Sequence, residues 1–372
     1  MIWIVISLTL TMAYCMLILA YWYGYSRMPY FNLLLEPKTK FTVIIPARNE
    51  EKNLKHCVES IINQNYPQEL IEIIIVDDNS DDNTFAIADD FRIKYKNITI
   101  LKTNDFKVSG KKHAITIAIQ NAKNDYCVLT DADCRCSENW LLSINSFLQK
   151  NQTVFIYAPV TFTEYTLFQK IQALEFAGLV GIGGAAINLK NPNMCSASNM
   201  VVLKNVFIEV DGYKDNLHLS AGDDELLLQK IFKHYPNQVY FLKSKQAIVT
   251  TDANHTVKQL TDQRRRWVSN STKYENIYIT LILIGAYIFN FSIAFNLIYG
   301  IFNQSFLICG LVQLILKIIV EGGFLYNVLK LFNKQYLIRY LLLAQPLHIF
   351  YVIVIGIWAN INAYNWKGRQ AN

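Results

Sequence analysis

The sequence predicts an α/β fold: one domain with a mixed sheet, preceded by one membrane-spanning helix and followed by about three. Apolar residues make up 52% of the 372 residues and gather at the two ends of the chain, whereas charged residues gather in the middle. Within that middle part, short runs of Ile and Val alternate with helical patterns, an order typical of α/β sheets. We therefore divide the chain into an N-terminal transmembrane helix (1–24), a middle domain (25–276) and a C-terminal transmembrane region (277–372).

The apolar ends are long enough to cross a bilayer, which takes about 20 helical residues. Segment 1–24 lacks charge, a basic start and a small-residue cleavage site, so we interpret it as an anchor, with a signal peptide as the alternative. We expect Lys317 and Glu321, in the later apolar part, to pair one turn apart and face protein, because unpaired charge in a bilayer is costly. The later apolar segments are 277–302, 305–329 and 337–359.

The distribution of charge predicts how the chain is oriented. The middle domain has 29 basic and 28 acidic residues, so the net charge of +6 comes mostly from the membrane flanks and does not indicate a nucleic-acid partner. The basic connection 330–339 is expected in the cytoplasm, and the middle domain with it. Four spans would place the tail, with Lys367 and Arg369, outside. Because basic tails tend to stay inside, a re-entrant C-terminal segment is the alternative.

The middle domain is predicted to contain a sheet buried on both faces. Uninterrupted runs of Ile and Val indicate strands that helices cover on both sides, as in parallel sheets. Ligands of such sheets bind at the carboxyl ends of the strands. The predicted strands are 41–46, 71–78, 97–102 and 126–133, and the helices between them are 50–64, 82–96 and 111–123.

Two further helices are predicted between the sheet and the C-terminal apolar part. Apolar residues from Leu167 to Ile182 share one helical face, which fits either an amphipathic helix at the membrane surface or a helix packed in the core. Segment 256–275 is polar with a helical pattern and leads directly into the apolar segment that begins at residue 277.

Polar residues follow the first two predicted strands. The first ends in Ala47-Arg48-Asn49-Glu50, which lacks the GxGxxG pattern of dinucleotide-binding folds and so disfavours a dehydrogenase. The second ends in Asp77-Asp78, whose carboxylates can accept hydrogen bonds from a base or ribose, or can cap the next helix.

The last predicted strand ends in two aspartates, Asp131 and Asp133. Alternate residues of a strand point to the same side, so the two carboxylates should converge. Mg²⁺ is commonly held by one or two carboxylates together with substrate phosphates. Lys111 opens the preceding helix, where a cation suits phosphate, although a surface lysine is the alternative.

Two clusters lie later in the domain. Asp223-Asp224-Glu225 opens a predicted helix, and three acids exceed what helix capping requires. In Gln263-Arg264-Arg265-Arg266-Trp267, helical spacing puts Gln263, Arg266 and Trp267 on one side, suited to a diphosphate and a sugar ring. Arg264 and Arg265 are expected to point elsewhere, towards anionic lipid. The alternative is that all three arginines form a basic cluster beside the membrane.

In chain order, these motifs resemble those of the membrane-integrated family 2 glycosyltransferases of GT-A fold, which include cellulose, hyaluronan and chitin synthases and ceramide glucosyltransferase. The resemblance spans roughly residues 40–270. Each motif alone is weak, but five in this order are specific. Asp223-Asp224 stands where the family has Glu-Asp, and the chain lacks the long N-terminal helical pore of cellulose synthases.

The resemblance implies a role for each matching residue. Asp224 would be the general base, Asp131 and Asp133 would bind a divalent metal, Mg²⁺ or Mn²⁺, and Gln263 and Trp267 would meet the acceptor. The residues implied to bind the nucleotide-sugar donor are Ala47, Arg48, Glu50, Asp78, Lys111, Asp131 and Arg266.

The resemblance also implies an activity. We expect an inverting transfer of a sugar from a nucleotide-sugar, with a UDP-sugar as the favoured donor, to a membrane lipid at the cytoplasmic face of the cell membrane. A processive polysaccharide synthase with a growing glycan as acceptor is the alternative. A further alternative is an inactive receptor that binds nucleotide or polysaccharide.

Overall fold

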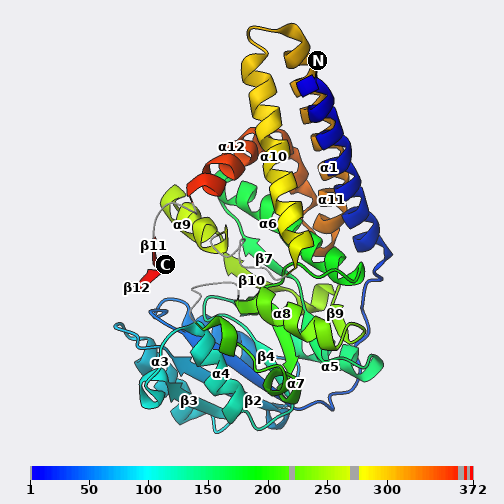
Figure 1. Ribbon diagram of the computed structural model, residues 1–372. Coiled ribbons are helices and arrows are strands. Elements are labelled where there is room, and N and C mark those ends of the chain that lie inside the picture. Colours follow the sequence, from blue (N-terminus) through cyan, green and yellow to red (C-terminus); the bar gives the residue numbers. More distant parts are fainter. Residues whose placement is uncertain (1, 218–222, 269–275, 359–363, 367–368, 372) are drawn as a thin grey trace.

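A seven-stranded mixed sheet is the centre of the middle domain in the computed structural model, which describes residues 2–217, 223–268, 276–358, 364–366 and 369–371 (Figure 1). The strand order is β3-β2-β1-β4-β8-β6-β9. The first four of these run parallel, whereas β8 runs antiparallel to both of its neighbours. The strands are β1 (Phe41–Ala47), β2 (Ile71–Asp77), β3 (Ile98–Lys102), β4 (Tyr126–Leu129), β6 (Phe155–Tyr157), β8 (Met200–Leu203) and β9 (Val239–Phe241).

Helices cover both faces of this sheet, as the unbroken runs of Ile and Val predicted. Alternate residues of β1 point to opposite faces: Val43 and Ile45 pack with α2, α3 and α5, whereas Ile44 packs with α4, α7 and α8. A smaller sheet of β5 (Arg135–Cys136), β10 (Val249–Asp252) and β7 (Val160–Thr163) lies beside it. The helices are α2 (Leu54–Ile62), α3 (Thr84–Lys94), α4 (Lys111–Asn121), α5 (Trp140–Lys150), α7 (Lys204–Glu209) and α8 (Asp223–His234).

Most predicted elements of the first half are present, with one correction. β4 ends at Leu129, short of the predicted 126–133, because the chain leaves the sheet at Thr130 and carries both DxD aspartates in the loop. The predicted helix 256–275 corresponds to α9 (Val257–Val268), and residues 269–275 lie outside the described residues. So do Gly222, before the acidic cluster, and Lys367 of the tail.

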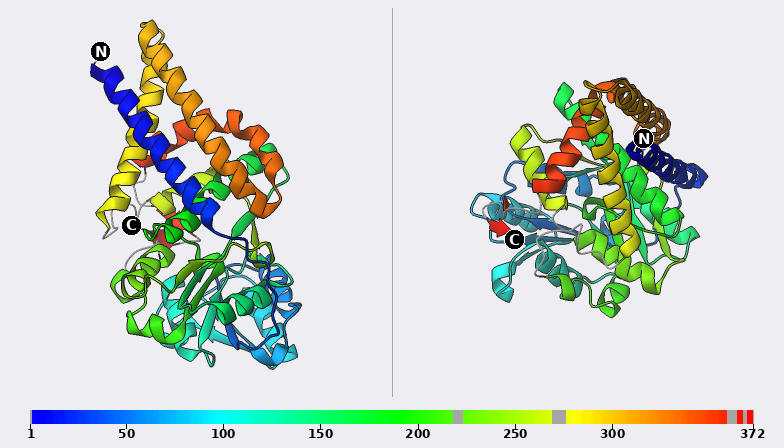
Figure 2. Two further views of the ribbon diagram at one scale, coloured as in Figure 1. Left: turned by 90° about the vertical axis from the view of Figure 1, so that its right-hand side faces the viewer. Right: turned by 45° about the horizontal axis from the view of Figure 1, so that its top comes forward.

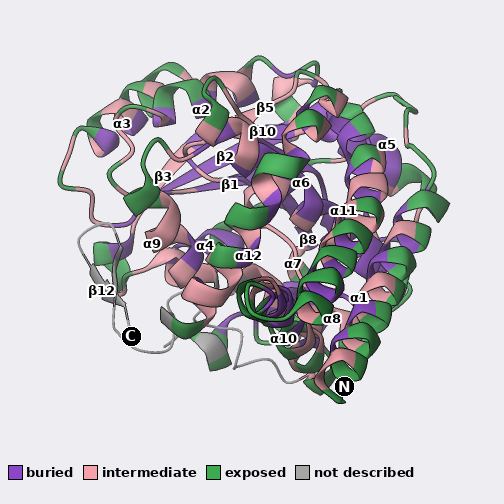
Figure 3. Cartoon of the chain, turned by 90° about the horizontal axis from the view of Figure 1, so that it is seen from above, coloured by how far each residue is buried: buried purple, intermediate pink, exposed green. Residues whose placement is uncertain are grey.

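Three long helices stand together above the domain (Figure 2). They are α1 (Ile2–Arg27), α10 (Ile277–Tyr299) and α11 (Gln304–Phe332), and each contacts the other two. Their outward faces are exposed, as the view from above shows (Figure 3). The exposed residues include many large apolar ones. By length and composition, five helices in the described part of the chain could cross a membrane: these three, α6 (Leu167–Asn188) and the segment Gln335–Ile357.

Polar side chains fill the inside of this bundle. Asn296 of α10 donates its Nδ2 to Ser7 Oγ of α1 at 3.0 Å and to Gln313 Oε1 of α11 at 2.7 Å. Lys317 Nζ lies 2.6 Å from Glu321 Oε1 and is fully buried, so the predicted one-turn pair faces protein. Hydrogen bonds between buried amides hold such helices together.

The last long helix, α12 (Leu341–Trp358), lies across the bundle instead of beside it. The start of α12 packs closely against α11, because a Cβ added to Gly322 would lie 3.1 Å from Leu341. Its end packs against α10, because a Cβ added to Gly356 would lie 2.6 Å from Tyr287. Gly322 and Tyr287 each lie about 15 Å from the domain-side end of their helix, at 1.5 Å per residue. The following strand β11 (Tyr364–Trp366) contacts α9. The chain therefore returns towards the domain.

Helix α6 joins the domain to the bundle. It contacts α1, α11, β7 and β9, and most of its residues are buried, so it is a core helix rather than one lying on a surface. Gly181 permits a close approach, because a Cβ there would lie 2.4 Å from Val328 Cγ2 of α11.

Lys243 makes a second junction. Its buried Nζ donates to the carbonyl oxygens of Tyr25 and Met28, at 2.9 and 3.0 Å, where α1 ends. It also lies 4.1 Å from the centre of the Tyr25 ring.

Candidate active site

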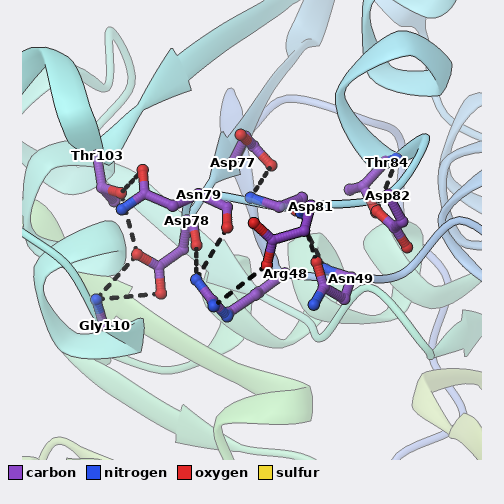
Figure 4. A network of polar contacts seen from close by, with 11 residues as sticks. Arg48, Asn49, Asp77, Asp78, Asn79, Asp81, Asp82, Thr84, Thr103 and Gly110 are labelled. Atoms are coloured by element: carbon purple, nitrogen blue, oxygen red, sulfur yellow. Dashed lines mark hydrogen bonds and ion pairs between the residues drawn. The ribbon is translucent and has the colours of Figure 1, made fainter. Parts of the chain in front are cut away.

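Two loops at the ends of β1 and β2 form the first wall of the site (Figure 4). Arg48 donates to the carbonyl oxygens of Asp78 at 2.8 Å and Asn79 at 2.9 Å. Asn49 and Asn79 have positive φ angles of 52° and 58°, a conformation that asparagine tolerates better than most residues. The Arg48 guanidinium therefore fastens one loop to the other.

The three other predicted donor residues of this wall differ in how they could act. The side chain of Ala47 is buried in the core, so only its backbone can meet a nucleotide, and its carbonyl already accepts from the Asp78 N–H at 2.8 Å. Glu50 accepts from Asn53 Nδ2 at 2.9 Å. The Asp78 carboxylate accepts from the Gly110 N–H at 2.9 Å, which holds the start of α4 against the end of β2.

Asp131 is the centre of the charged part of the site. Its Oδ1 lies 2.5 Å from Lys111 Nζ, and its Oδ2 accepts from the Ser198 hydroxyl at 2.6 Å. Burial alone would raise the pKa of this carboxyl, but the charge and hydrogen bond of Lys111, the Ser198 hydroxyl and the charge of Arg266 together hold it below its usual value. The structure thus brings together Lys111, Asp131 and Arg266, three of the residues that the resemblance implies for donor binding.

Asp224 binds the same short segment, Ser196–Asn199, that binds Asp131. Its Oδ2 accepts from the Ala197 N–H at 2.9 Å, and Ala197 is the chain neighbour of Ser198, which binds Asp131. Consecutive Cα atoms are about 3.8 Å apart, so two adjacent residues connect Asp224 to the DxD motif. Sequence reasoning missed Ala197 and Ser198. The local signal is the stretch Ser196–Asn199 before β8, which is polar except for Ala197.

The DxD aspartates fit a metal that the donor brings with it, not a preformed protein cage. No group of three or more His, Cys, Asp or Glu side chains able to hold a metal occurs among the residues with described positions. Asp131 already binds Lys111 and Ser198, and Asp133 stands half-buried two residues further on. Mg²⁺ typically needs only one or two carboxylates when substrate phosphates supply the remaining ligands.

Helix α9 carries the last predicted motif and corrects one expectation. Arg264 does not face lipid: it is 1% exposed, and its Nη2 lies 3.0 Å from Glu175 Oε2 of α6. Its guanidinium also lies 4.3 Å from the Trp267 ring, whose centre is 6.1 Å from that of Phe176 on α6. Gln263 accepts from Asn254 Nδ2 at 3.0 Å. Trp267 is therefore half-buried against α6. The charge of Arg266, by contrast, helps to lower the pKa of Asp131.

The first comparison concerns the family. Residues 42–211 match the family described as "Glycosyl transferase family 2". Over these residues the chain is therefore similar to family 2 glycosyltransferases, and its mixed sheet is that of the GT-A fold.

Several curated relatives match part of the chain. It is 26% identical over 191 residues to "Glycosyltransferase AglE" of Haloferax volcanii, which covers 49% of this chain and 58% of the relative. It is 32% identical over 114 residues to "Poly(ribitol-phosphate) beta-glucosyltransferase" of Bacillus spizizenii, and this match covers 31% of this chain and 18% of the relative. It is 35% identical over 111 residues to "4,4'-diaponeurosporenoate glycosyltransferase" of Staphylococcus aureus, covering 28% of each. In each case the match spans less than two thirds of the relative's length.

One solved structure resembles nearly the whole chain in fold. The mannosyltransferase PcManGT from Pyrobaculum calidifontis, in complex with GDP-Man and Mn²⁺, superposes with a TM-score of 0.60 at 16% identity, over 96% of this chain and 99% of that one. The shared fold therefore extends beyond the sheet domain to the long helices.

Proposed function

We propose that this protein transfers a sugar from a nucleotide-sugar donor to a membrane-lipid acceptor, with inversion at the anomeric carbon. One observation carries the proposal: adjacent residues Ala197 and Ser198 bind Asp224 and Asp131, so a candidate base is held beside a candidate donor site. An inactive receptor is disfavoured because all four acids implied in binding and chemistry are present, namely Asp78, Asp131, Asp133 and Asp224.

In the proposed reaction, Asp224 accepts the proton of the acceptor hydroxyl. The oxygen forms a bond to the anomeric carbon as the bond to the departing nucleoside diphosphate breaks, so one substitution inverts the configuration. Lys111 and Arg266, whose charges act on Asp131, would balance the charge that grows on the diphosphate. The loops that Arg48 and Asp78 hold together would orient the nucleoside.

Asp133, assisted by Asp131, would hold the divalent metal, Mg²⁺ or Mn²⁺. When bound, such an ion neutralises charge on the diphosphate. The related fold of PcManGT contains Mn²⁺ and GDP-Man, which supports a metal and a nucleoside diphosphate sugar here. We retain a UDP-sugar as the expected donor and include GDP-sugars in the test.

A lipid acceptor is favoured over a growing polymer by the packing of the bundle. Buried Asn296, Gln313 and Phe289 occupy the space between α1, α10 and α11, so side chains fill the interior where a polymer channel would run. The lipid would approach between α6 and α10, with its hydroxyl beside Trp267.

The decisive experiment incubates membranes containing the protein with a panel of radiolabelled UDP- and GDP-sugars. A labelled product of fixed size in the lipid fraction is expected. Label that stays at the origin of the lipid chromatogram and lengthens with time would show a polymerase. No product from any donor would contradict the assignment as a transferase.

We also propose that the catalytic domain faces the cytoplasm at the cell membrane, because the basic segment 330–339 lies against it. Cysteines introduced separately at Asn151 and Gln370 should both resist an impermeant thiol reagent in intact cells, since α12 returns the tail to the domain side. Labelling at Asn151 would overturn the orientation. Labelling at Gln370 alone would instead support four full spans.

A further inference from the structure

A groove at the junction of the domain and the bundle has the composition of a binding site for lipid phosphate. Its volume is about 460 Å³, and none of its lining residues is acidic. The lining comes from the linker after α1, from η5 (Lys245–Ala247), from the last turn of α11 and from η6 (Gln335–Tyr340). The lining residues are Tyr30, Asn32, Lys245, Lys330 and Gln335.

The groove lies at the depth of lipid headgroups if the bundle crosses the membrane as proposed above. At 1.5 Å per residue, α11 is about 44 Å long. A bilayer with its headgroup regions is about 40–45 Å thick. Lys330 is in the last turn of α11, and Tyr30 follows the end of α1 by three residues. Both helices therefore place the groove at the domain-side surface of the bilayer.

The two lysines of the groove carry charge that no described acid neutralises. Lys245 Nζ donates to the neutral Asn333 Oδ1 at 2.6 Å, and Lys330 Nζ lies 5.1 Å from the centre of the Tyr326 ring. The nearby Lys334 differs, because it pairs with Glu164. Two uncompensated cations without a carboxylate suit a phosphate, and they offer nothing to the amine of a zwitterionic headgroup.

The surroundings match those of a membrane interface. Tyr30, Tyr326 and Tyr336 are exposed, at 37%, 46% and 45%, and Leu33 and Leu34 of the linker are each 41% exposed. Tyrosines concentrate at the headgroup level of membrane proteins, and basic side chains there attract anionic lipids.

We propose that this groove binds the headgroup of an anionic glycerophospholipid. Lys245 and Lys330 hold the phosphate, and Asn32, Gln335 and the Tyr30 hydroxyl supply hydrogen bonds to the glycerol and headgroup oxygens. The acyl chains then lie along the exposed apolar faces of α1 and α11. This site is separate from the proposed catalytic residues.

The test is native mass spectrometry of the full-length protein in neutral detergent with added phosphatidylglycerol or phosphatidylcholine of the same acyl chains. The protein should retain phosphatidylglycerol preferentially. Each lysine near an anionic lipid contributes about fivefold in affinity, so Lys245→Gln with Lys330→Gln should weaken retention by about 25-fold. The charge-retaining pair Lys245→Arg with Lys330→Arg should keep it, and Lys94→Gln with Lys150→Gln, two exposed lysines of the catalytic domain, is the matched control.

Three outcomes would overturn the proposal: equal retention of both lipids, equal loss in the groove and control variants, or displacement by inorganic phosphate at the same concentration. Transferase activity with a soluble detergent-dispersed acceptor, measured on the same samples, keeps this test independent. If the wild-type protein is active but shows no lipid selectivity, only the groove proposal is refuted. If it selects phosphatidylglycerol but has no transferase activity, only the proposed reaction is refuted.

Discussion

Charged residues have opposite surroundings in two regions of this molecule. In the loops at the strand ends, Lys111 and Asp131 pair with side-chain exposures of 36% and 27%, at the edge where a donor would bind. In the layer formed by α6, α9 and the bundle, Lys317 and Arg264 are at most 1% exposed and are paired within the protein. The loop charges can be shared with a ligand, whereas the helical-layer charges serve packing. Loop variants should therefore lose activity and keep stability, and helical-layer variants should lose stability.

The largest effect is expected at Asp224. Replacing it with Asn removes the proposed proton acceptor and should lower kcat by about 10²–10⁴-fold, because that is the usual contribution of a general base. Donor binding and the thermal unfolding midpoint should stay close to wild type. Activity within a factor of three of wild type would transfer the role to Asp223 or Glu225, each to be replaced in the same way.

Removal of divalent metal should have the next largest effect. An excess of chelator should lower activity by about 10²-fold, since a metal contributes several kcal/mol to stabilising charge, and Mg²⁺ or Mn²⁺ should restore it. Asp133→Asn should shift the metal concentration needed for half-maximal activity upwards. Full activity in the chelator would exclude a catalytic role for the metal.

The buried pair of Glu175 on α6 and Arg264 on α9 tests the expectation that variants of the helical layer lose stability. Glu175→Gln leaves Arg264 buried without its counter-charge and should reduce the free energy of unfolding by about 3 kcal/mol. Asp89→Asn, which breaks the exposed pair with Arg92 on α3, is the matched control and should cost under about 1 kcal/mol. Replacing both partners, as Glu175→Leu with Arg264→Met, should recover stability. Equal effects of the two single variants would remove the distinction between the regions.

Trp267 lies where the two regions meet, so its replacement should affect both properties modestly. Trp267→Ala removes a ring face and should raise the acceptor KM by about two- to tenfold while changing the donor KM less, because aromatic contacts contribute about 0.5–1.5 kcal/mol. Trp267→Phe should behave nearly as wild type, and Tyr165→Ala, an exposed aromatic, should have no effect. A larger change in the donor KM would place Trp267 in the donor site.

The smallest effect concerns Lys243 at the junction with α1. Burial lowers the pKa of this ammonium from 10.5 to about 8. Between these two values the unfolded chain binds more protons than the folded one, so the free energy of unfolding should rise as pH rises from 8 to 10.5. Lys243→Met should remove this part of the pH dependence in thermal melts. An unchanged slope would show that the Lys243 ammonium titrates normally.

The sequence predicted which residues gather at the strand ends much better than it predicted the packing of the helical layer. Asp78, Lys111 and Asp131 follow parallel strands or open the helices between them, and the carboxyl ends of parallel strands meet at one edge. Ala197 and Ser198 escaped prediction because they precede β8, whose antiparallel direction and position beside β4 depend on pairing between distant segments.

The misplacement of Arg264 has the same origin. Helical spacing correctly separates Arg264 from Arg266, but it does not reveal what lies on the opposite side of α9. That side meets Glu175 of α6, 89 residues earlier in the chain, and a local pattern contains no information about such a partner.

The amide network of the bundle has a consequence for how the chain is made. Gln313 Nε2 donates to the Ser7 carbonyl across 306 residues of sequence, so α1 must await its partner while nearly the whole chain is synthesised. At about 5–20 residues per second this interval lasts about 15–60 s. The Thr11 hydroxyl donates to the Ser7 carbonyl of its own helix at 2.7 Å, and this bond can form within α1 before α11 is synthesised.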